Sequence, residues 1–247
     1  LDNKLTMDLS RQLRHPLATM SADADKCYDR INHIVMSLLL LAIIGTVGPV
    51  VAMLHPIQSM KFYQRTARGD SKTFMGGRGR DNPLQGLCQG NGAAPACWLI
   101  ICSVLMHCYK SRSFGSRIIS PISGAVIDFL GEIYVDDTDL KVTHPDLETP
   151  KAVLEGLHSS AEAWSSGLNS TGGAINPDKS RWILASYEWI NGLWRYSSQP
   201  EIEMTIPLPD GTRAPISNGL VETAEKSLGV WSAIDGNDSK HIEENVT

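Results

Sequence analysis

The stretch that decides the fold is residues 129–143, F-L-G-E-I-Y-V-D-D-T-D-L-K-V-T. Two β-prone runs, residues 129–135 and 138–143, meet there at the acidic pair Asp136-Asp137. Runs rich in β-branched and aromatic residues on either side of a short polar pair are typical of two strands joined by a tight turn. The stretch therefore predicts a strand pair with a two-residue acidic turn.

Further strands and helices are predicted on both sides of this pair. Residues 17–20, L-A-T-M, indicate a strand that ends near Asp23. An apolar run of helical length begins at Pro95, and proline is favoured in the first turn of a helix. Residues 151–166 repeat apolar side chains near helical spacing and predict an amphipathic helix.

Two hairpins are predicted nearer the C-terminal end. An Asn-Gly pair at residues 191–192 separates residues 181–190 from residues 193–196, and Asn-Gly favours the type I′ turn, whose twist matches that of its strands. A second turn, P-D-G at residues 209–211, separates two more β-prone runs. The whole order of elements predicts an α+β fold with an antiparallel β-sheet covered by helices on one face.

Residues 34–54 contain no charged side chain, and the run is long enough to cross a membrane as one helix. The sequence G-T-V-G-P at residues 45–49 interrupts it, because glycine commonly ends a helix and proline commonly starts one. We therefore predict two buried helices, over residues 31–44 and 49–65, and no membrane span. A membrane protein built around this run is the alternative.

The composition is that of a globular protein. The 247 residues are 42% hydrophobic and 20% charged, which excludes a disordered chain. The net charge of −5 hides an asymmetry, since residues 1–125 contain 14 Lys and Arg and 7 Asp and Glu, whereas residues 126–247 contain 8 and 20. A basic half is suited to a polyanion and an acidic half to cations, although two differently charged solvated faces are the simpler interpretation.

The five cysteines form no C-x-x-C pair, which disfavours a zinc ribbon or a thioredoxin-like site. We expect reduced, mostly buried thiols in an intracellular protein, in the nucleus or the cytoplasm. No signal peptide is predicted, so the protein is not expected to be secreted. Residues 61–81 are basic and become Gly-rich, which is typical of a nucleic-acid-contacting loop or of an ordinary surface loop.

Three separated elements carry the chemistry. Residues 23–29 read D-A-D-K-C-Y-D, residues 89–95 read Q-G-N-G-A-A-P, and residues 134–137 read Y-V-D-D. In this order they resemble the palm motifs of reverse transcriptases, the RNA-directed DNA polymerases, of the retroelement or non-LTR retrotransposon type. Residues 172–179, G-G-A-I-N-P-D-K, and the Leu-Gly pair at residues 228–229 resemble two further motifs of that family.

The resemblance implies a polymerase palm that transfers nucleotides by two-metal chemistry. Two Mg²⁺ or Mn²⁺ ions would activate the primer's 3′ oxygen and stabilise the leaving pyrophosphate. Asp23 and Asp136 are implied as metal ligands with Asp137 in support, and the backbone carbonyl of Ala24 as a ligand of the nucleotide-side metal. Lys179 is the implied general acid. The implied partners are an RNA template, a DNA primer and deoxynucleoside triphosphates, with no membrane.

Three further residues are implied on the nucleotide side of the site. Tyr28 stands where the family has an aromatic residue that packs under the sugar and excludes a 2′-hydroxyl. Gln89 and Gly90 are implied to line the incoming nucleotide and the templating base. Simpler interpretations stay open, because Tyr28 also fits a core aromatic, and Lys179 a solvated surface lysine.

The departures from the family pattern concern its flanking domains. Only 22 residues precede Asp23, and the resemblance therefore implies a palm with part of the fingers and without the thumb, the missing segments lying on a parent polyprotein. We expect the reverse transcriptase palm over residues 1–197, with a fingers-proximal insert at about residues 60–88. A C-terminal β-hairpin region leading to the thumb is expected over residues 198–247.

Two other functions stay open. A degenerate, non-catalytic domain of the same fold would bind nucleic acid without synthesis, but the presence of all three carboxylates argues against decay of the site. An RNA-directed RNA polymerase shares the palm but usually carries G-D-D, and Tyr134 and Val135 before the acidic pair argue against it.

Overall fold

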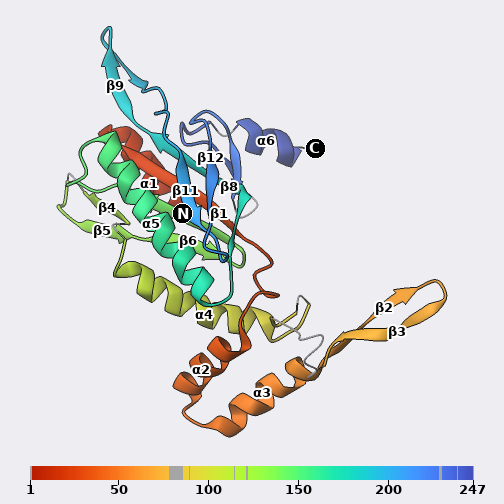
Figure 1. The fold of residues 1–247 in the computed structure, drawn as a ribbon. Coiled ribbons are helices and arrows are strands. Elements are labelled where there is room, and N and C mark those ends of the chain that lie inside the picture. The colour runs from red at the N-terminus through yellow and green to blue at the C-terminus, as the bar shows by residue number, and fades with distance from the viewer. Residues whose placement is uncertain are drawn as a thin grey trace. The chain divides into compact units, whose positions relative to one another are not determined.

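The computed structural model describes residues 2–77, 86–88, 90–113, 115–120, 122–227, 230–237 and 239–246 (Figure 1). The chain divides into two compact units. The sheet unit comprises Leu1–Asp25, Leu105–Ser170 and Ala174–Thr247. The two-helix unit comprises Lys26–Val104 and Thr171–Gly173.

The sheet unit contains a six-stranded sheet in the order β11-β12-β8-β1-β7-β6 (Figure 1). Its strands are β1 (Leu17–Ala24), β6 (Gly131–Tyr134), β7 (Asp137–Val142), β8 (Ile175–Ala185), β11 (Met204–Pro207) and β12 (Arg213–Asn218). All neighbouring strands are antiparallel except β12 and β8, which pair in parallel through Ser217 and Asn218. The predicted α+β class is confirmed, and this parallel pair is the one departure from the predicted antiparallel pairing among these six strands.

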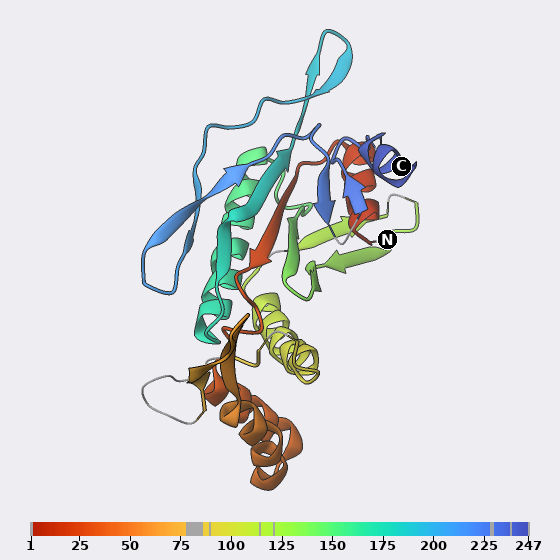
Figure 2. The same ribbon diagram turned by 90° about the vertical axis from the view of Figure 1, so that its right-hand side faces the viewer.

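One long helix, α5 (Pro150–Ser170), lies against the sheet and contacts β1, β7, β8 and β11 (Figure 2). Its large buried side chains recur at helical spacing: Val153, Leu154, Leu157, Trp164 and Leu168. Trp164 also meets Tyr109 of α4 (Ala94–Lys110) edge to face, with ring centroids 5.9 Å apart. Burial of this apolar stripe holds α5 on the sheet, as its sequence pattern predicts.

The rest of the sheet unit consists of short elements. A buried cluster of Ile183, Ala185, Val221 and Ile234 packs against Met7, which belongs to α1 (Asp2–Leu13). Separate two-stranded pairs are β4 (Ser116–Ile119) with β5 (Val126–Phe129), β9 (Tyr187–Ile190) with β10 (Leu193–Tyr196), and β13 (Glu225–Ser227) with β14 (Val230–Ser232); α6 (Ser239–Val246) follows. The β9–β10 hairpin confirms the predicted Asn-Gly turn, whereas α1 and the β4–β5 hairpin were not expected. Residues 198–247 were expected to form a C-terminal region separate from the palm. β11 and β12 lie in that region, but they are strands of the six-stranded sheet.

The apolar run over residues 34–54 forms two helices, α2 (His33–Ile44) and α3 (Val47–Ser59). Gly45 ends α2 with φ +76°, and its amide donates to the Leu41 carbonyl, an arrangement that glycine adopts without strain. The interruption predicted from the sequence is confirmed. Among the described residues no helix combines the length and the apolar character needed to cross a membrane.

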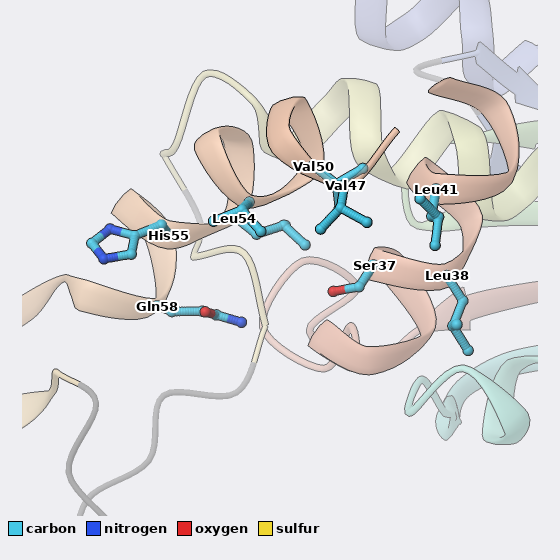
Figure 3. Close-up of a pocket in the computed structure, with 9 residues that line it drawn as sticks. Ser37, Leu38, Leu41, Val47, Val50, Leu54, His55 and Gln58 are labelled. Atoms are coloured by element: carbon cyan, nitrogen blue, oxygen red, sulfur yellow. The ribbon is translucent and has the colours of Figure 1, made fainter. Parts of the chain in front are cut away.

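The two helices enclose an apolar hollow of about 230 Å³, with side chains of both helices along its walls (Figure 3). The lining residues are Ser37, Leu38, Leu41, Val47, Val50, Val51, Leu54, His55 and Gln58. The prediction that both helices are buried is wrong in part, since Ile34 and Ile43 of α2 are 70% and 64% exposed and Val47 of α3 is 63% exposed. A charge-free sequence predicts an apolar helix, but it does not show which faces of the helix pack against other residues of the chain.

The second helix is shorter than predicted, and a hairpin follows it. α3 ends at Ser59, and β2 (Lys61–Thr66) pairs antiparallel with β3 (Gly69–Gly76). The expected helix to residue 65 and the expected loop from residue 61 are therefore wrong. The sequence did not reveal the strands, because both are largely exposed and show no apolar periodicity.

The cysteines are free thiols, with four buried and Cys108 exposed, as expected.

Candidate functional site

The three acidic residues come together where β1 meets the β6–β7 hairpin. Asp23 is the second-last residue of β1 and pairs directly with Asp137, the first residue of β7. Asp136 precedes it in the turn, and its carbonyl accepts a hydrogen bond from the Ala24 amide, with N and O 2.8 Å apart. The turn is thereby tied to the end of β1, and carboxylates from two distant segments share one edge of the sheet.

The β6–β7 turn is held in an unusual backbone conformation. Val135 has φ +57°, the left-handed region that β-branched residues rarely adopt. Tyr134 beside it is 63% exposed. At the other end of β6, a Cβ on Gly131 would lie 2.5 Å from the carbonyl oxygen of Asp139. Glycine at that position therefore allows β6 to pair closely with β7.

A bulge in β8 brings a lysine to the acidic residues. Residues 177–180 interrupt the regular pairing of β8 with β1, and Lys179 Nζ lies 3.7 Å from Asp23 Oδ2. The buried Ser180 hydroxyl anchors the bulge, because it donates to the Asn176 carbonyl at 2.7 Å and accepts from the Asp23 amide at 3.2 Å. Bulges of this kind re-aim side chains near functional sites.

Burial and mutual repulsion make the carboxylates at this edge less ready to ionise. Burial raises the pKa of Asp23; the attraction of Lys179 works against that rise, and the charges of Asp136 and Asp25 add to it. Burial raises the pKa of Asp137 as well, and the charges of Asp136 and Asp23 raise it further. Crowded carboxylates ionise less readily because each resists the charge of the others. A divalent cation between them would remove that repulsion.

The donor atoms suit Mg²⁺ or Mn²⁺, although the site is an open one. The described part of the chain contains no group of three or more His, Cys, Asp or Glu side chains that could hold a metal ion. Mg²⁺ takes hard oxygen ligands and usually keeps several waters, so one or two carboxylates are enough. Asp23 and Asp137, on paired strand positions, and Asp136 beside them supply such oxygens.

The residues expected on the nucleotide side belong to the other unit. Tyr28 is half-buried and meets Trp98 edge to face, with centroids 6.5 Å apart. Gly90 is exposed with φ +89°, a conformation that favours glycine. Gln89 and the Leu-Gly pair at residues 228–229 lie outside the described residues. The structure thus brings together Asp23, Ala24 and the acidic pair with Lys179.

No role was expected for Ser180 or Asn176, which fix the bulge that carries Lys179. Asn176 was recognised as part of the motif at residues 172–179, but not as a residue that shapes the bulge. Ser180 follows the motif and gave no signal, since a serine beside a lysine is usual on any polar strand end.

The comparisons with known proteins found no family model and no curated protein that match this chain. Solved structures that align with it include a telomerase from Candida tropicalis in complex with the TWJ fragment of telomeric RNA, at 15% identity and a TM-score of 0.48, over 74% of this chain and 29% of that one. An apo telomerase from Candida tropicalis, truncated from its C-terminal domain, aligns at 15% identity and a TM-score of 0.48 over 87% and 39%. A telomerase from Candida albicans with the same RNA fragment aligns at 14% identity and a TM-score of 0.48 over 83% and 30%. The chain spans less than half the length of these telomerases, and a likeness of this degree assigns no function.

Proposed function

We propose that this chain is the palm of an RNA-directed DNA polymerase of the retroelement type. The observation that carries the proposal is the direct pairing of Asp23 with Asp137, together with the hydrogen bond from Ala24 to Asp136. Residues far apart in the sequence, and matched to separate motifs, share one sheet edge. Lys179, from a third motif, lies beside them.

The substrates are an RNA template, a DNA primer and deoxynucleoside triphosphates. Asp23, Asp136 and Asp137, with the backbone carbonyl of Ala24, would hold two Mg²⁺ or Mn²⁺ ions. When bound, such ions lower the pKa of an attacking hydroxyl and stabilise the charge of the departing phosphates. The clustering of carboxylates from two strands supports this assignment. Lys179 is a positively charged partner of Asp23, and bound metal ions would offset the negative charge that remains.

The remaining residues act on the nucleotide. Lys179 holds a proton at Nζ that the leaving pyrophosphate would accept, and its 67% exposed side chain is free to reach outward from Asp23. Tyr28, whose ring meets Trp98 edge to face, would pack under the sugar and exclude a 2′-hydroxyl. Gln89 and Gly90 would line the incoming nucleotide and the templating base.

Primer extension tests the proposal. A labelled DNA primer on an RNA template is incubated with deoxynucleotides and Mg²⁺ or Mn²⁺, using this chain alone and this chain joined to the fingers and thumb that the proposal implies. We expect elongation that a chelator abolishes. Elongation of an RNA primer with ribonucleotides instead would identify an RNA-directed RNA polymerase. Binding of primer–template without synthesis in either metal would favour the non-catalytic nucleic-acid-binding domain.

A further inference from the structure

The β2–β3 hairpin of the two-helix unit carries positive charge that the acidic side chains of the described residues neutralise only in part. Residues 61–76 contain four basic side chains and one acidic side chain, Asp70. Arg65 engages Asp70 through two hydrogen bonds, at 2.9 and 3.4 Å. Within the described part of the chain, no acidic side chain forms an ion pair with Arg68 or Lys72, and both are exposed. The hairpin is therefore suited to a polyanion.

Aromatic rings lie on the same hairpin. Tyr63 and Phe74 are cross-strand partners with ring centroids 5.7 Å apart, and they are 48% and 36% exposed. Lys61 Nζ lies 4.4 Å from the centroid of the Phe74 ring. Because side chains alternate along a strand, Lys61 and Tyr63 share one face of β2 where its pairing with β3 is regular. Basic groups and aromatic rings are thus combined on one exposed hairpin, and we call its exposed side chains Lys61, Tyr63, Arg68, Lys72 and Phe74 the hairpin face.

We propose that the hairpin face binds single-stranded nucleic acid, with bases stacked on Tyr63 and Phe74 and phosphates held by Lys61, Arg68 and Lys72. Exposed aromatic rings beside a basic track bind single strands with little sequence preference, because every base has a face that can stack. The strand would be the unpaired part of a template or primer, and to that extent the inference rests on the proposed function. The chemistry of the hairpin face does not depend on the carboxylates.

An isolated two-stranded hairpin is at best marginally stable in water, and β2–β3 has no further strand neighbour in the described part of the chain. Such an element gains order when a ligand spans both strands. The exposed Tyr63 and Phe74 would then acquire a partner.

The β9–β10 hairpin provides an internal control. It is also two-stranded, and its Trp189 and Trp194 are 60% and 48% exposed. Residues 187–196, however, contain one acidic and one basic side chain, Glu188 and Arg195, which face each other across the strands. If aromatic exposure alone decided binding, both hairpins would bind nucleic acid. If charge and rings are both needed, only β2–β3 does.

The experiment measures binding of labelled oligo(U) RNA and oligo(dT) DNA to the whole chain by fluorescence anisotropy, in EDTA and over a range of salt concentrations. Each phosphate contact to a single strand contributes about 0.7 to the slope of log K against log salt. Arg68→Ala with Lys72→Ala should therefore lower the slope by about 1.4. Lys151→Ala with Arg195→Ala, two exposed basic side chains elsewhere, should leave the slope unchanged.

The aromatic arm compares Tyr63→Leu with Trp194→Leu. Stacking is worth about 1–3 kcal/mol per base, so Tyr63→Leu should weaken binding roughly tenfold, and Trp194→Leu should not weaken it. Equal losses in the two variants, an unchanged slope without Arg68 and Lys72, or no binding by the wild-type chain at low salt would each overturn the proposal. The relative affinities of RNA and DNA distinguish a template strand from a primer strand.

These measurements need neither metal nor synthesis, so they separate the two proposals. Hairpin-dependent binding by a chain that extends no primer would refute the polymerase and leave the hairpin face. If the hairpin-face variants bound nucleic acid like the wild type and still showed metal-dependent extension, the hairpin-face proposal would be refuted and the polymerase proposal would stand.

Discussion

Lys179 can be either a general acid or a counter-ion of Asp23, and the two roles predict rates that differ by orders of magnitude. Its Nζ lies 3.7 Å from Asp23 Oδ2, but the lysine side chain is 67% exposed. Ion pairs between exposed groups contribute about 0–1 kcal/mol, which corresponds to roughly a fivefold effect on rate at most. General acid assistance is usually worth about a hundredfold to ten-thousandfold.

We therefore expect Lys179→Ala to slow nucleotide addition by on the order of a hundredfold or more. Lys179→Arg retains the positive charge beside Asp23, but a guanidinium gives up its proton very poorly, since arginine stays protonated in proteins. The arginine variant should consequently remain as slow as the alanine variant. Single-turnover addition of one deoxynucleotide to a DNA primer on an RNA template measures the chemical step without product release.

Lys151→Ala is the matched control, because Lys151 is 80% exposed and also faces an acidic partner, Glu155, at 3.8 Å. Its rate should equal that of the wild type. Full activity of Lys179→Arg, or a loss below about tenfold in Lys179→Ala, would refute the general-acid role and leave Lys179 as a counter-ion.

Three further changes test the site and the fold. Asp136→Asn keeps the exposed turn but removes a charge that would hold the metals; loss of several kcal/mol of metal stabilisation means about a thousandfold slower extension, with primer–template binding retained. Tyr28→Ala should raise ribonucleotide incorporation when the two sugars compete, and unchanged discrimination would leave Tyr28 as a packing partner of Trp98. Leu157→Ala, fully buried on α5, should cost about 2–5 kcal/mol in urea unfolding, whereas Glu155→Ala on its exposed face should change stability by less than about 0.5 kcal/mol.

The elements that the sequence predicts well are those that bury a regular apolar pattern or contain a specific turn. The buried positions of α5 repeat at helical spacing, and the helix extends beyond the predicted residues 151–166 by only a few residues. The Asn-Gly turn is found where predicted, with φ +51° at Asn191 and φ +81° at Gly192. In both cases local sequence and burial favour the same structure.

The missed elements are those in which burial does not impose a period. β2 is exposed at every position, so neither strand alternation nor a helical stripe appears in its sequence. The apolar run that precedes it made a helix to residue 65 look continuous, yet the backbone of Met60 is extended, with ψ +141°. Pairing with β3 decides this segment, and such cross-strand contacts are invisible to a local pattern.

The sequence places Asp23 and the acidic pair near strand ends but does not fix their mutual geometry. Asp23 was expected at a strand end and is found there. The expected two-residue acidic turn is wrong by one position, because Tyr134 pairs with Asp137 and the turn consists of Val135 and Asp136. The register that sets Asp23 opposite Asp137 depends on which side chains of β1 and β7 pack together under α5. The bulge that carries Lys179 toward Asp23 depends on the buried Ser180 hydroxyl, which no motif marks.

Three locally unfavourable features meet at this one sheet edge. Val135 has φ +57°, and a strained backbone of this kind costs about 1–3 kcal/mol. Burial, and after it the neighbouring carboxylate charges, raise the pKa of Asp23 and of Asp137, and β8 gives up regular pairing beside them. The same chain uses Asn191-Gly192, a pair without such strain, where a hairpin has only to turn. The chain can thus form a hairpin turn without strain. At the β6–β7 turn it instead holds a strained valine between a tyrosine and two aspartates, a conformation that folding alone does not require. Such local conflicts are expected at functional sites, which is why the β6–β7 turn, and not the apolar hollow between α2 and α3, is where the chemistry of this protein is to be sought.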